Sequence, residues 1–429
     1  MKKLLKIIVC LIVLGVIVAI IGLATMPSRQ YDGTKFANED ATEKAASVER
    51  GRYVAITGDC QACHHSSDNT SLSGGYGIET PFGTIFASNI TPDKETGIGN
   101  WSEEQFANAV RNGKGPNGPL YPAMPYTSYV KMSDQDIHDL WNYIKTLKPV
   151  HNRVVENQLP FPFNIRYLML GWNRLFFDAT PLQDDNTQSE EWNRGRYLAE
   201  GAAHCSMCHT PRNNFGAEQK KSAYHGAVLQ NWFAPAITND DRSLANWSKE
   251  DLVTYLKTGR NRLTVASGPM SEAVVASFQY FNDKDLNAVA TYIKSLQSQK
   301  TSAVTPLSID NPKVAMGKRI YFDNCAACHV SNGKGIPNMI PAFAGNNGIL
   351  DKSTESMIHV LLAGSQGAIT KSNPTAASMP GFAWRLTDRE AAAVLTYIRN
   401  SWGNGASPVD ENQVKDMRKA LKAPSPFGQ

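Results

Sequence analysis

The chain has 429 residues, of which 42% are apolar and 19% charged, a composition typical of a globular protein and not of a disordered one. Lys and Arg number 43 against 39 Asp and Glu, and three of the lysines (Lys2, Lys3 and Lys6) precede an apolar stretch at the N-terminus. The remainder is therefore close to neutral and has no basic run, so we expect no nucleic acid among its partners. At roughly 150 residues per domain, the length suggests about three domains.

The N-terminal apolar stretch, residues 7–24, contains no charged residue. As a helix it would be about 27 Å long, close to the thickness of the hydrocarbon core of a bilayer. We therefore expect residues 1–26 to form a membrane anchor. A cleaved signal peptide is the alternative, because Gly22 and Ala24 are small enough for a cleavage site. Either way the lysines stay in the cytoplasm, which predicts a protein on the periplasmic side of the inner membrane, N-terminally anchored if the segment is retained.

Residues 27–46 are polar and aperiodic, and we expect a linker. The chain then repeats itself three times. Each repeat opens with a glycine, a basic residue and an aromatic residue at an expected helix start, and closes with a helix that carries Tyr-Ile followed by a basic residue. The opening glycines are Gly51, Gly195 and Gly317, and the closing tyrosines are Tyr143, Tyr292 and Tyr397.

Capping signals precede the closing helices, at Ser133, Asn282 and Thr387. A middle helix is expected after Trp101-Ser102 and after Trp247-Ser248. Strand patterns are sparse, so the predicted fold class is all-α, with three small domains in tandem. Their predicted bounds are 47–150, 189–298 and 313–403, with a linker at 299–312 and a tail at 404–429 that we interpret as a solvated end.

The connection between the first two domains, residues 151–188, is unusual. Its part 159–177 is dense in aromatic and aliphatic residues and has only Arg166 and Arg174 as charged residues. It is too short and too interrupted by proline to span a membrane. The composition suits a bilayer interface or a groove on a partner protein. The alternative is a segment that packs on the domains it joins.

Each repeat contains Cys-x-x-Cys-His, a pattern for which chance predicts roughly 0.002 occurrences in this composition. Two thiols three residues apart on a helical turn can both reach the vinyl groups of a porphyrin, and the next residue can present its imidazole to the iron. A zinc site would require a second cysteine pair in the same domain, and a thioredoxin-like pair would require a βαβ context. The sequence therefore predicts three covalently bound haem c groups. The attachment residues are Cys60, Cys63, Cys205, Cys208, Cys325 and Cys328, and the iron-binding histidines are His64, His209 and His329.

The sixth iron ligand should come from a loop before each closing helix. Met124, Met270 and Met379 lie in such positions, next to proline. Ser271 follows Met270 where the outer repeats have proline, so the middle ligand is the least secure. Met132, Met339 and Met357 are poorly placed. Fallback ligands, each more simply read as a surface or packing histidine, are His65, His138, His151, His204, His225 and His359.

An iron held by His and Met on both sides has no free position for substrate and reorganises little when an electron arrives or leaves. This describes an electron carrier, so we expect no catalytic residues in the chain. The enzyme activity would belong to the complex of which it is a non-catalytic subunit.

Further motifs strengthen this interpretation. They include Glu79-Thr80-Pro81-Phe82-Gly83, Tyr121-Pro122-Ala123-Met124-Pro125, Trp232-Phe233-Ala234-Pro235 and Trp384-Arg385-Leu386. With the haem motifs, the chain over residues 48–403 resembles the tri-haem cytochrome c subunit of bacterial membrane-bound periplasmic dehydrogenases, which oxidise gluconate, sorbitol, fructose or alcohols. The resemblance implies three class I cytochrome c-like domains and a separate catalytic subunit containing flavin or quinone. It also implies that the haems pass electrons to ubiquinone or another respiratory acceptor.

Two rival functions remain open from the sequence. One is the anchored c-type subunit of a terminal oxidase, which is also a carrier. The other is a haem peroxidase, which would need one iron with a labile ligand, and Met270 is the weakest candidate. No G-x-G-x-x-G follows a strand, so nothing in the sequence resembles a dinucleotide or flavin fingerprint.

Overall fold

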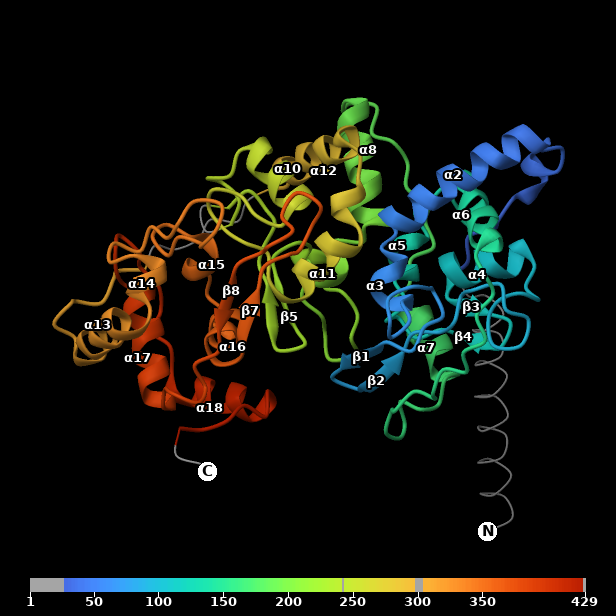
Figure 1. The fold of residues 1–429 in the computed structure, drawn as a ribbon. Coiled ribbons are helices and arrows are strands. Elements are labelled where there is room, and N and C mark those ends of the chain that lie inside the picture. The colour runs from blue at the N-terminus through green and yellow to red at the C-terminus, as the bar shows by residue number, and fades with distance from the viewer. Residues whose placement is uncertain (1–26, 241–242, 298–303, 427–429) are drawn as a thin grey trace, which may run out of the picture. The chain divides into compact units, whose positions relative to one another are not determined.

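The computed structural model of the protein describes residues 27–240, 243–297 and 304–426 (Figure 1). The predicted membrane anchor, residues 1–26, lies outside the described residues. Within them, none of the helices is both long enough and apolar enough to cross a bilayer. The chain divides into two compact units: the first holds the described residues up to Ala55 and Cys63–Asp184, and the second holds Ile56–Ala62 and the described residues from Asp185 onward.

The N-terminal part of the chain, up to residue 184, combines helices with two short hairpins. Its helical elements are η1 (Gly33–Phe36), α2 (Ala41–Thr57), α3 (Cys60–His64), α4 (Glu103–Asn112), α5 (Tyr126–Tyr129), α6 (Asp134–Thr146) and α7 (Leu168–Phe176). Its antiparallel hairpins pair β1 (Gly77–Thr80) with β2 (Gly83–Phe86) and β3 (Lys114–Gly115) with β4 (Gly118–Pro119).

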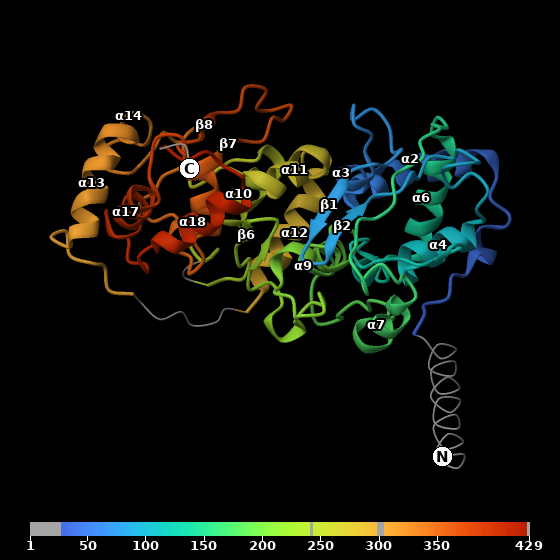
Figure 2. The same ribbon diagram turned by 90° about the horizontal axis from the view of Figure 1, so that it is seen from below.

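The C-terminal part holds two further sets of helices, each with one antiparallel hairpin (Figure 2). The first set consists of α8 (Glu190–Tyr197), the π-helix η2 (Leu198–Ala202), α9 (Ser206–His209), η3 (Lys220–Ser222), β5 (Ala227–Leu229), β6 (Trp232–Ala234), α10 (Lys249–Thr258), α11 (Gly268–Ala276), η4 (Phe278–Tyr280) and α12 (Asp283–Ser295). The second consists of α13 (Pro312–Asn324), α14 (Ala326–His329), α15 (Asn347–Leu350), α16 (Glu355–Ala363), β7 (Gly364–Gln366), β8 (Ser378–Pro380), α17 (Asp388–Arg399) and α18 (Glu411–Ala420).

The described residues are thus mostly helical, as predicted, and their named strands form only two-stranded antiparallel hairpins. The predicted helix starts are confirmed by the caps. Ser102 and Ser248 begin α4 and α10, and each forms a reciprocal capping box with the residue three positions on. The side chains of Ser133, Asn282 and Thr387 likewise accept hydrogen bonds from backbone N–H groups in the first turns of α6, α12 and α17.

The opening glycines do not start helices, contrary to the sequence-based expectation. Gly51, Gly195 and Gly317 lie inside α2, α8 and α13, at the points where these helices cross α6, α12 and α17. A methyl group at these glycines would lie 1.8, 1.9 and 2.1 Å from the carbonyl oxygens of Asp139, Ala288 and Ala393, and 2.8–2.9 Å from the Cβ atoms of the closing tyrosines. The glycine and Tyr-Ile motifs are therefore the two sides of one close helix crossing, which outweighs the weak helix propensity of glycine.

Residues 27–46, expected to be a linker, instead pack on the first domain. The backbone N–H of Arg29 donates to Asn112 Oδ1 at 2.8 Å, and the guanidinium donates to the carbonyl oxygen of Met132 at 2.7 Å. Phe36 stacks on His138 with ring centroids 4.1 Å apart. The helix α2 also begins within this range, at Ala41. The sequence did not indicate these contacts, because the apolar residues of this segment follow neither a helical nor a strand period.

The C-terminal tail also differs from the expectation of a solvated end. In α18, Val414 and Met417 are buried in the core of the third domain. The guanidinium of Arg418 donates to the carbonyl oxygens of Ala383 and Leu386 at 2.7 and 2.8 Å and to Asp388 Oδ1 at 2.8 Å. A short amphipathic helix with few apolar residues is thus held by two buried apolar side chains and one buried arginine, which its charge-rich sequence did not indicate.

Candidate haem sites

Each Cys-x-x-Cys-His motif lies on a short helix that follows an opening helix. The first motif is α3 itself, whereas Cys205 and Cys325 cap the N-termini of α9 and α14. Residues three and four apart on a helix share one face, so both thiols and the imidazole of each motif can face the same space. None of these six cysteines forms a disulfide.

The ring of each motif histidine is oriented by a backbone carbonyl. His64 Nδ1 lies 2.7 Å from the carbonyl oxygen of Ser88, and His209 Nδ1 lies 2.7 Å from that of Pro235. Because a carbonyl oxygen can only accept, the ring proton is on Nδ1 and the lone pair is on Nε2. A neutral imidazole with a free Nε2 is the form that binds iron, and such a second partner is usual for metal-binding histidines.

Hairpins supply the first two of these carbonyls. Ser88 lies two residues beyond β2, and Pro235 directly follows β6. In the third domain a looser turn, bridged between Ile336 and Ile340, takes the place of the hairpin. There the distance from His329 Nδ1 to the carbonyl oxygen of Pro341 is 3.4 Å. The third histidine is therefore held by the weakest of the three bonds.

The backbone of each motif histidine is held as well. The carbonyl oxygens of His64, His209 and His329 accept hydrogen bonds from the N–H groups of three glycines, Gly74, Gly226 and Gly335, at 2.8, 2.8 and 3.2 Å. All three glycines have positive φ, between 61° and 81°, and a Cβ there would come within 3 Å of the strand or turn opposite. Glycine is needed at these positions because other residues rarely adopt this conformation and would not fit.

Burial sets the protonation of the side chains in the three motifs. Burial lowers the pKa of His64, His209 and His329, which keeps the imidazoles neutral. Burial also raises the pKa of Cys205 to about 12 and that of Cys208 and of Cys325 to about 11. These three groups are therefore thiols at neutral pH. Among the described residues, no group of three or more His, Cys, Asp and Glu side chains is placed to hold a metal ion.

The three predicted methionine ligands lie on different kinds of element. Met124 is in the turn before α5, Met270 is the third residue of α11 and Met379 is the middle residue of β8. The expectation of a loop is therefore met only by the first. All three side chains are partly buried and pack against the apolar core of their own domain. Of the poorly placed alternatives, Met132 is fully buried and Met339 is half exposed.

The fallback histidines have other partners. His138 Nδ1 lies 2.7 Å from Glu103, and His151 lies 3.8 Å from Asp93. The Nδ1 atoms of His204, His225 and His359 lie within 3.0 Å of the carbonyl oxygens of Ala202, Ala223 and Asn231. His65 contacts the ring of Tyr76. These contacts agree with the interpretation of the six as surface or packing histidines.

Trp232 lies between the start of α11, which contains Met270, and the third domain. The sequence did not indicate these contacts. The indole of Trp232 covers Gly268, where a Cβ would lie 2.5 Å from the ring. On its other side it stacks on His359 of α16, with centroids 4.0 Å apart. Next to it, Ser356 Oγ accepts from the N–H of Phe233 at 2.8 Å and donates to its carbonyl oxygen at 3.1 Å. The second and third domains thus meet along β6, the strand that leads to Pro235.

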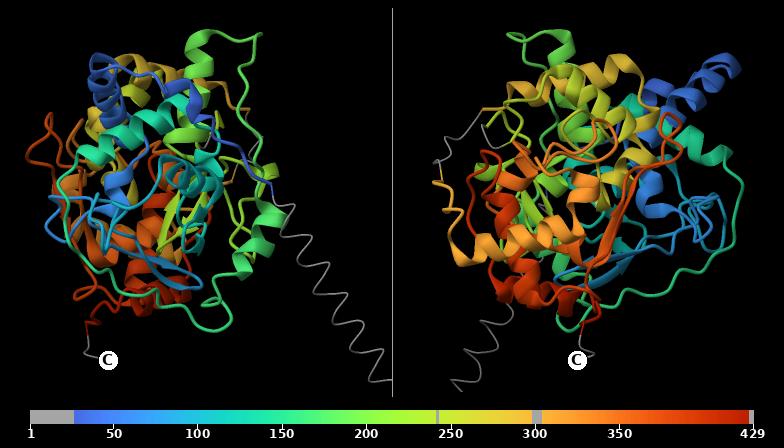
Figure 3. Two further views of the ribbon diagram at one scale, coloured as in Figure 1. Left: turned by 90° about the vertical axis from the view of Figure 1, so that its right-hand side faces the viewer. Right: turned by 60° about the vertical axis from the view of Figure 1, so that its left-hand side comes forward.

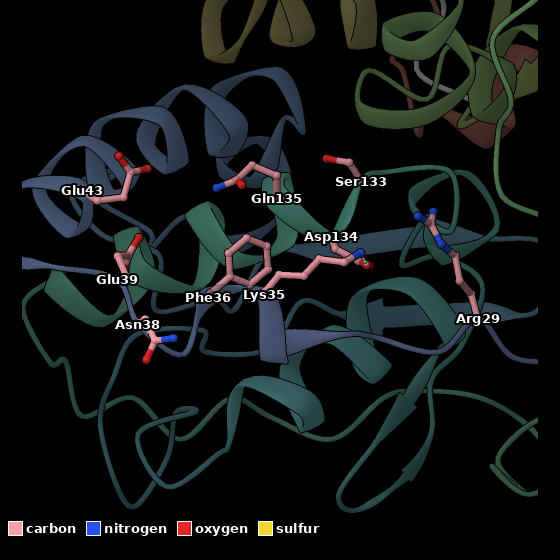
Figure 4. Close-up of a pocket in the computed structure, with 9 residues that line it drawn as sticks. All are labelled: Arg29, Lys35, Phe36, Asn38, Glu39, Glu43, Ser133, Asp134 and Gln135. Carbon is pink, nitrogen blue, oxygen red and sulfur yellow. Dashed lines mark hydrogen bonds and ion pairs between the residues drawn. The ribbon is translucent and has the colours of Figure 1, made fainter.

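An open hollow of about 650 Å³ lies on the first domain, apart from these residues (Figure 4). Charged side chains of both signs line it, and Lys35 Nζ lies 3.4 Å from Asp134 Oδ2. None of its lining residues is a predicted haem residue. Its charged side chains already have partners: Lys35 pairs with Asp134, Glu43 with Arg50 and Glu39 with His138.

Comparison with known proteins identifies the family. The cytochrome c family model matches residues 48–148, 193–297 and 314–402. The chain is 38% identical over 397 residues to the gluconate 2-dehydrogenase cytochrome c subunit of Pantoea cypripedii, covering 87% of this chain and 90% of that protein. It is 37% identical over 414 residues to the fructose dehydrogenase cytochrome subunit of Gluconobacter japonicus, covering 89% and 85%.

A third relative is the cytochrome c subunit of alcohol dehydrogenase (quinone) from Gluconobacter oxydans, 36% identical over 401 residues and covering 89% of this chain and 83% of that protein. The resemblance inferred from the motifs is confirmed. The chain therefore belongs to the family of cytochrome c subunits of dehydrogenases, and it has three cytochrome c domains that imply three haem c groups.

Proposed function

We propose that the protein accepts electrons from the catalytic subunit of a periplasmic dehydrogenase and passes them through its three haems to ubiquinone or another respiratory acceptor. The observation that supports this most directly is the threefold repeat of one arrangement. In it, a neutral imidazole is fixed by a backbone carbonyl next to two cysteines that form no disulfide. Such a site binds haem c, whose iron exchanges one electron at a time.

The haem-binding residues follow from the motifs. Thioether bonds would form at Cys60, Cys63, Cys205, Cys208, Cys325 and Cys328. His64, His209 and His329 would bind the irons through Nε2, and Met124, Met270 and Met379 would occupy the opposite positions. The protein's own contribution is to hold the imidazoles neutral, to orient them and to surround the sites with apolar side chains that exclude water.

The partners are proposed from the relatives. Their names assign them to gluconate, fructose and alcohol dehydrogenases, so the catalytic subunit of this complex would oxidise a sugar, a sugar acid or an alcohol. With residues 1–26 as a membrane anchor, the three domains would stand on the periplasmic side of the inner membrane.

The function is tested by purifying the full-length protein from membranes with its neighbours attached. We expect a catalytic dehydrogenase subunit to co-purify, and the intact mass of this chain to exceed the polypeptide mass by three haems. Addition of the substrate of that subunit should reduce the haems, and ubiquinone should reoxidise them. Co-purification with a copper-haem oxidase would contradict the proposal, and so would haems that the dehydrogenase substrate fails to reduce.

A carbon monoxide titration separates an electron carrier from a peroxidase. If His and Met occupy both sides of every iron, the ferrous protein should bind little carbon monoxide. Binding by one full haem in three would instead favour the peroxidase alternative.

A further inference from the structure

The first domain carries an exposed apolar surface, formed by residues 159–177 and here called the aromatic segment. Phe161 is 79% exposed, Tyr167 67% and Leu175 75%. Phe163, Ile165 and Leu168 are each at least 39% exposed. Six large apolar side chains are thus exposed within fifteen residues, a concentration that soluble surfaces usually avoid and that is typical of an interaction site.

The aromatic segment is fastened to the first domain by its backbone and polar groups. The backbones of Gln158 and Thr84 exchange hydrogen bonds at 2.9 and 3.0 Å. Tyr121 Oη donates to the carbonyl oxygen of Phe163 at 2.9 Å, and Arg166 lies over the ring of Tyr121. These contacts fix the backbone of the aromatic segment on the first domain, so its exposed side chains have defined positions.

One face of α7 is buried against the first domain, and the opposite face is exposed. Asn173 is fully buried and accepts a hydrogen bond of 2.6 Å from Tyr126 Oη. On the opposite side, Leu168 and Leu175 are exposed, and a Cβ at Gly171 would meet no heavy atom within 4 Å. These residues, at spacings of three and four, share one helix face, and among the described residues of the first domain nothing covers that face.

The start of the described chain lies beside this surface. Arg29 donates to the carbonyl oxygen of Val130, and Val130 packs with Tyr126, Phe177 and Trp172 in one apolar cluster. Figures 2 and 3 show α7 and the first described residues side by side. Four residues separate Ala24, the end of the apolar N-terminal stretch, from Arg29, and the five Cα–Cα steps between the two span about 18 Å at most.

The composition of the aromatic segment suits the same environment. Residues 157–177 contain Arg166 and Arg174 and no acidic residue. Phe, Tyr, Trp and Arg are the residues that settle at the boundary between lipid headgroups and acyl chains, and anionic headgroups attract the arginines.

We propose that the aromatic segment inserts into the bilayer interface, so that the first domain lies directly on the membrane. The inference rests on the proposed anchor, because residues 7–24 in the bilayer would bring this face of the domain within reach of the lipids. The catalytic subunit is the competing occupant, and the experiment is chosen to distinguish it from the bilayer.

The test uses full-length protein in vesicles of phosphatidylcholine and phosphatidylglycerol that contain a lipid with a photoreactive group near the top of its acyl chain. After illumination, trypsin cleavage at Arg153, Arg166, Arg174 and Arg194 releases the segment in three peptides for mass spectrometry. We expect lipid adducts on the peptides with Phe161 and Leu175 to be several-fold more abundant than on the peptide with Phe215, which is 67% exposed on the second domain.

Matched variants complete the test. The double substitution Phe161→Ser with Leu175→Ser should lower the labelling of the segment several-fold, because serine hydroxyls favour water over the interface, and should leave three haems attached. The substitution Phe215→Ser removes an equally exposed aromatic side chain and should leave that labelling unchanged.

Two results would overturn the proposal: labelling of the segment no stronger than that of the Phe215 peptide, or labelling that disappears once the whole dehydrogenase complex is reconstituted. The second result would assign the surface to the catalytic subunit. The anchor is checked on separate vesicles. Release of the protein by an alkaline wash would contradict anchoring by residues 1–26, whereas retained, three-haem protein without lipid adducts would contradict only the role of the aromatic segment.

Discussion

The motif histidines differ in how firmly their rings are held. The Nδ1 atoms of His64 and His209 have carbonyl partners at 2.7 Å, whereas that of His329 has its partner at 3.4 Å. The ring of His329 also stacks on Phe343, with centroids 4.0 Å apart and planes 17° from parallel. Ring stacking thus replaces part of the orientation that a short hydrogen bond gives in the other two domains.

Replacing Met270 tests the least secure iron ligand. In Met270→Ala we expect one haem in three to bind carbon monoxide in the ferrous state, because the side opposite His209 would be open. The visible spectrum and a carbon monoxide titration measure the effect. Met339→Ala, at a half-exposed methionine, is the control and should bind no more than the unmodified protein. An unchanged titration in Met270→Ala would mean that another residue is the ligand.

A buried carboxyl in the third domain gives a pH-dependent prediction. Burial raises the pKa of Asp351 above its usual value. At a pH above the pKa of Asp351 in both the folded and the unfolded state, the folded protein holds a charged carboxylate away from water, which lowers the free energy of unfolding relative to a neutral side chain. At a pH below the pKa of the unfolded state the carboxyl is neutral in both states, and this loss of stability vanishes. Asp351→Asn, which keeps the acceptor for the N–H of Ser353, should therefore melt at a higher temperature at pH 7.

The difference in melting temperature should shrink as the pH falls through the pKa of Asp351 and disappear below pH ~4, the usual range of aspartate. Asp310→Asn, at an exposed position, serves as the control and should show no such dependence. A stabilisation by Asp351→Asn that persists undiminished at low pH would show that a contact and not the charge is responsible.

At the scale of elements, the three domains share the crossing of an opening and a closing helix. The two helices approach until a glycine of one touches a backbone carbonyl of the other, and a tyrosine of the closing helix lies against the same glycine. Next to this crossing the motif helix begins, so the crossing fixes where the thiols and the imidazole lie. Any side chain at the glycine would have to push the helices apart.

The substitution Gly195→Ala should destabilise the second domain by about 1–3 kcal/mol, the usual cost of overpacking a tight contact, despite the better helix propensity of alanine. Thermal denaturation followed by circular dichroism measures it. Gly171→Ala in α7 is the matched control: its methyl group meets no heavy atom within 4 Å, so it should be neutral or slightly stabilising. Equal melting temperatures for the two variants would contradict the crossing argument.

At the scale of the whole molecule, the second and third domains are coupled through β6. Ser356 and His359 of α16 hold Phe233 and Trp232, and Trp232 covers the glycine two residues before Met270. Loss of order in the third domain should therefore reach a predicted ligand segment of the second. The second and third domains resemble each other, yet their stabilities are not independent.

Removing the third haem tests this coupling. Cys325→Ala with Cys328→Ala should leave two haems attached and a loosened third domain, because an apolar haem fills the core of so small a domain. Hydrogen exchange should then accelerate at the N–H of Phe233, whose partner is Ser356. The N–H of Gln158, which bonds within the first domain, is the control. A third covalent haem in this variant would contradict the motif assignment, and unchanged exchange at Phe233 would contradict the coupling.

The sequence predicted the features that depend on the type and spacing of side chains. Cys-x-x-Cys-His, the caps at Ser133, Asn282 and Thr387 and the three domains all depend on residue type and spacing. It did not predict features that depend on the backbone. The carbonyls of Ser88, Pro235 and Pro341 have no signature of their own, and Gly195 looked like a helix start because glycine is rare inside helices. The packing of Arg29 and of α18 was missed because few apolar residues mark it.

The order of the parts along the chain bears on how each domain is completed. In every domain the cysteines and histidine come first, the carbonyl that orients the imidazole follows 12 to 26 residues later, and the methionine comes last. If the chain is exported from its N-terminus, as proposed above, both thiols of a domain would emerge while the rest of that domain is still crossing the membrane. Haem would then be attached while the polypeptide is still unfolded and its thiols are accessible. The later segments would fold around the haem afterwards, so attachment would not require a folded domain to unfold.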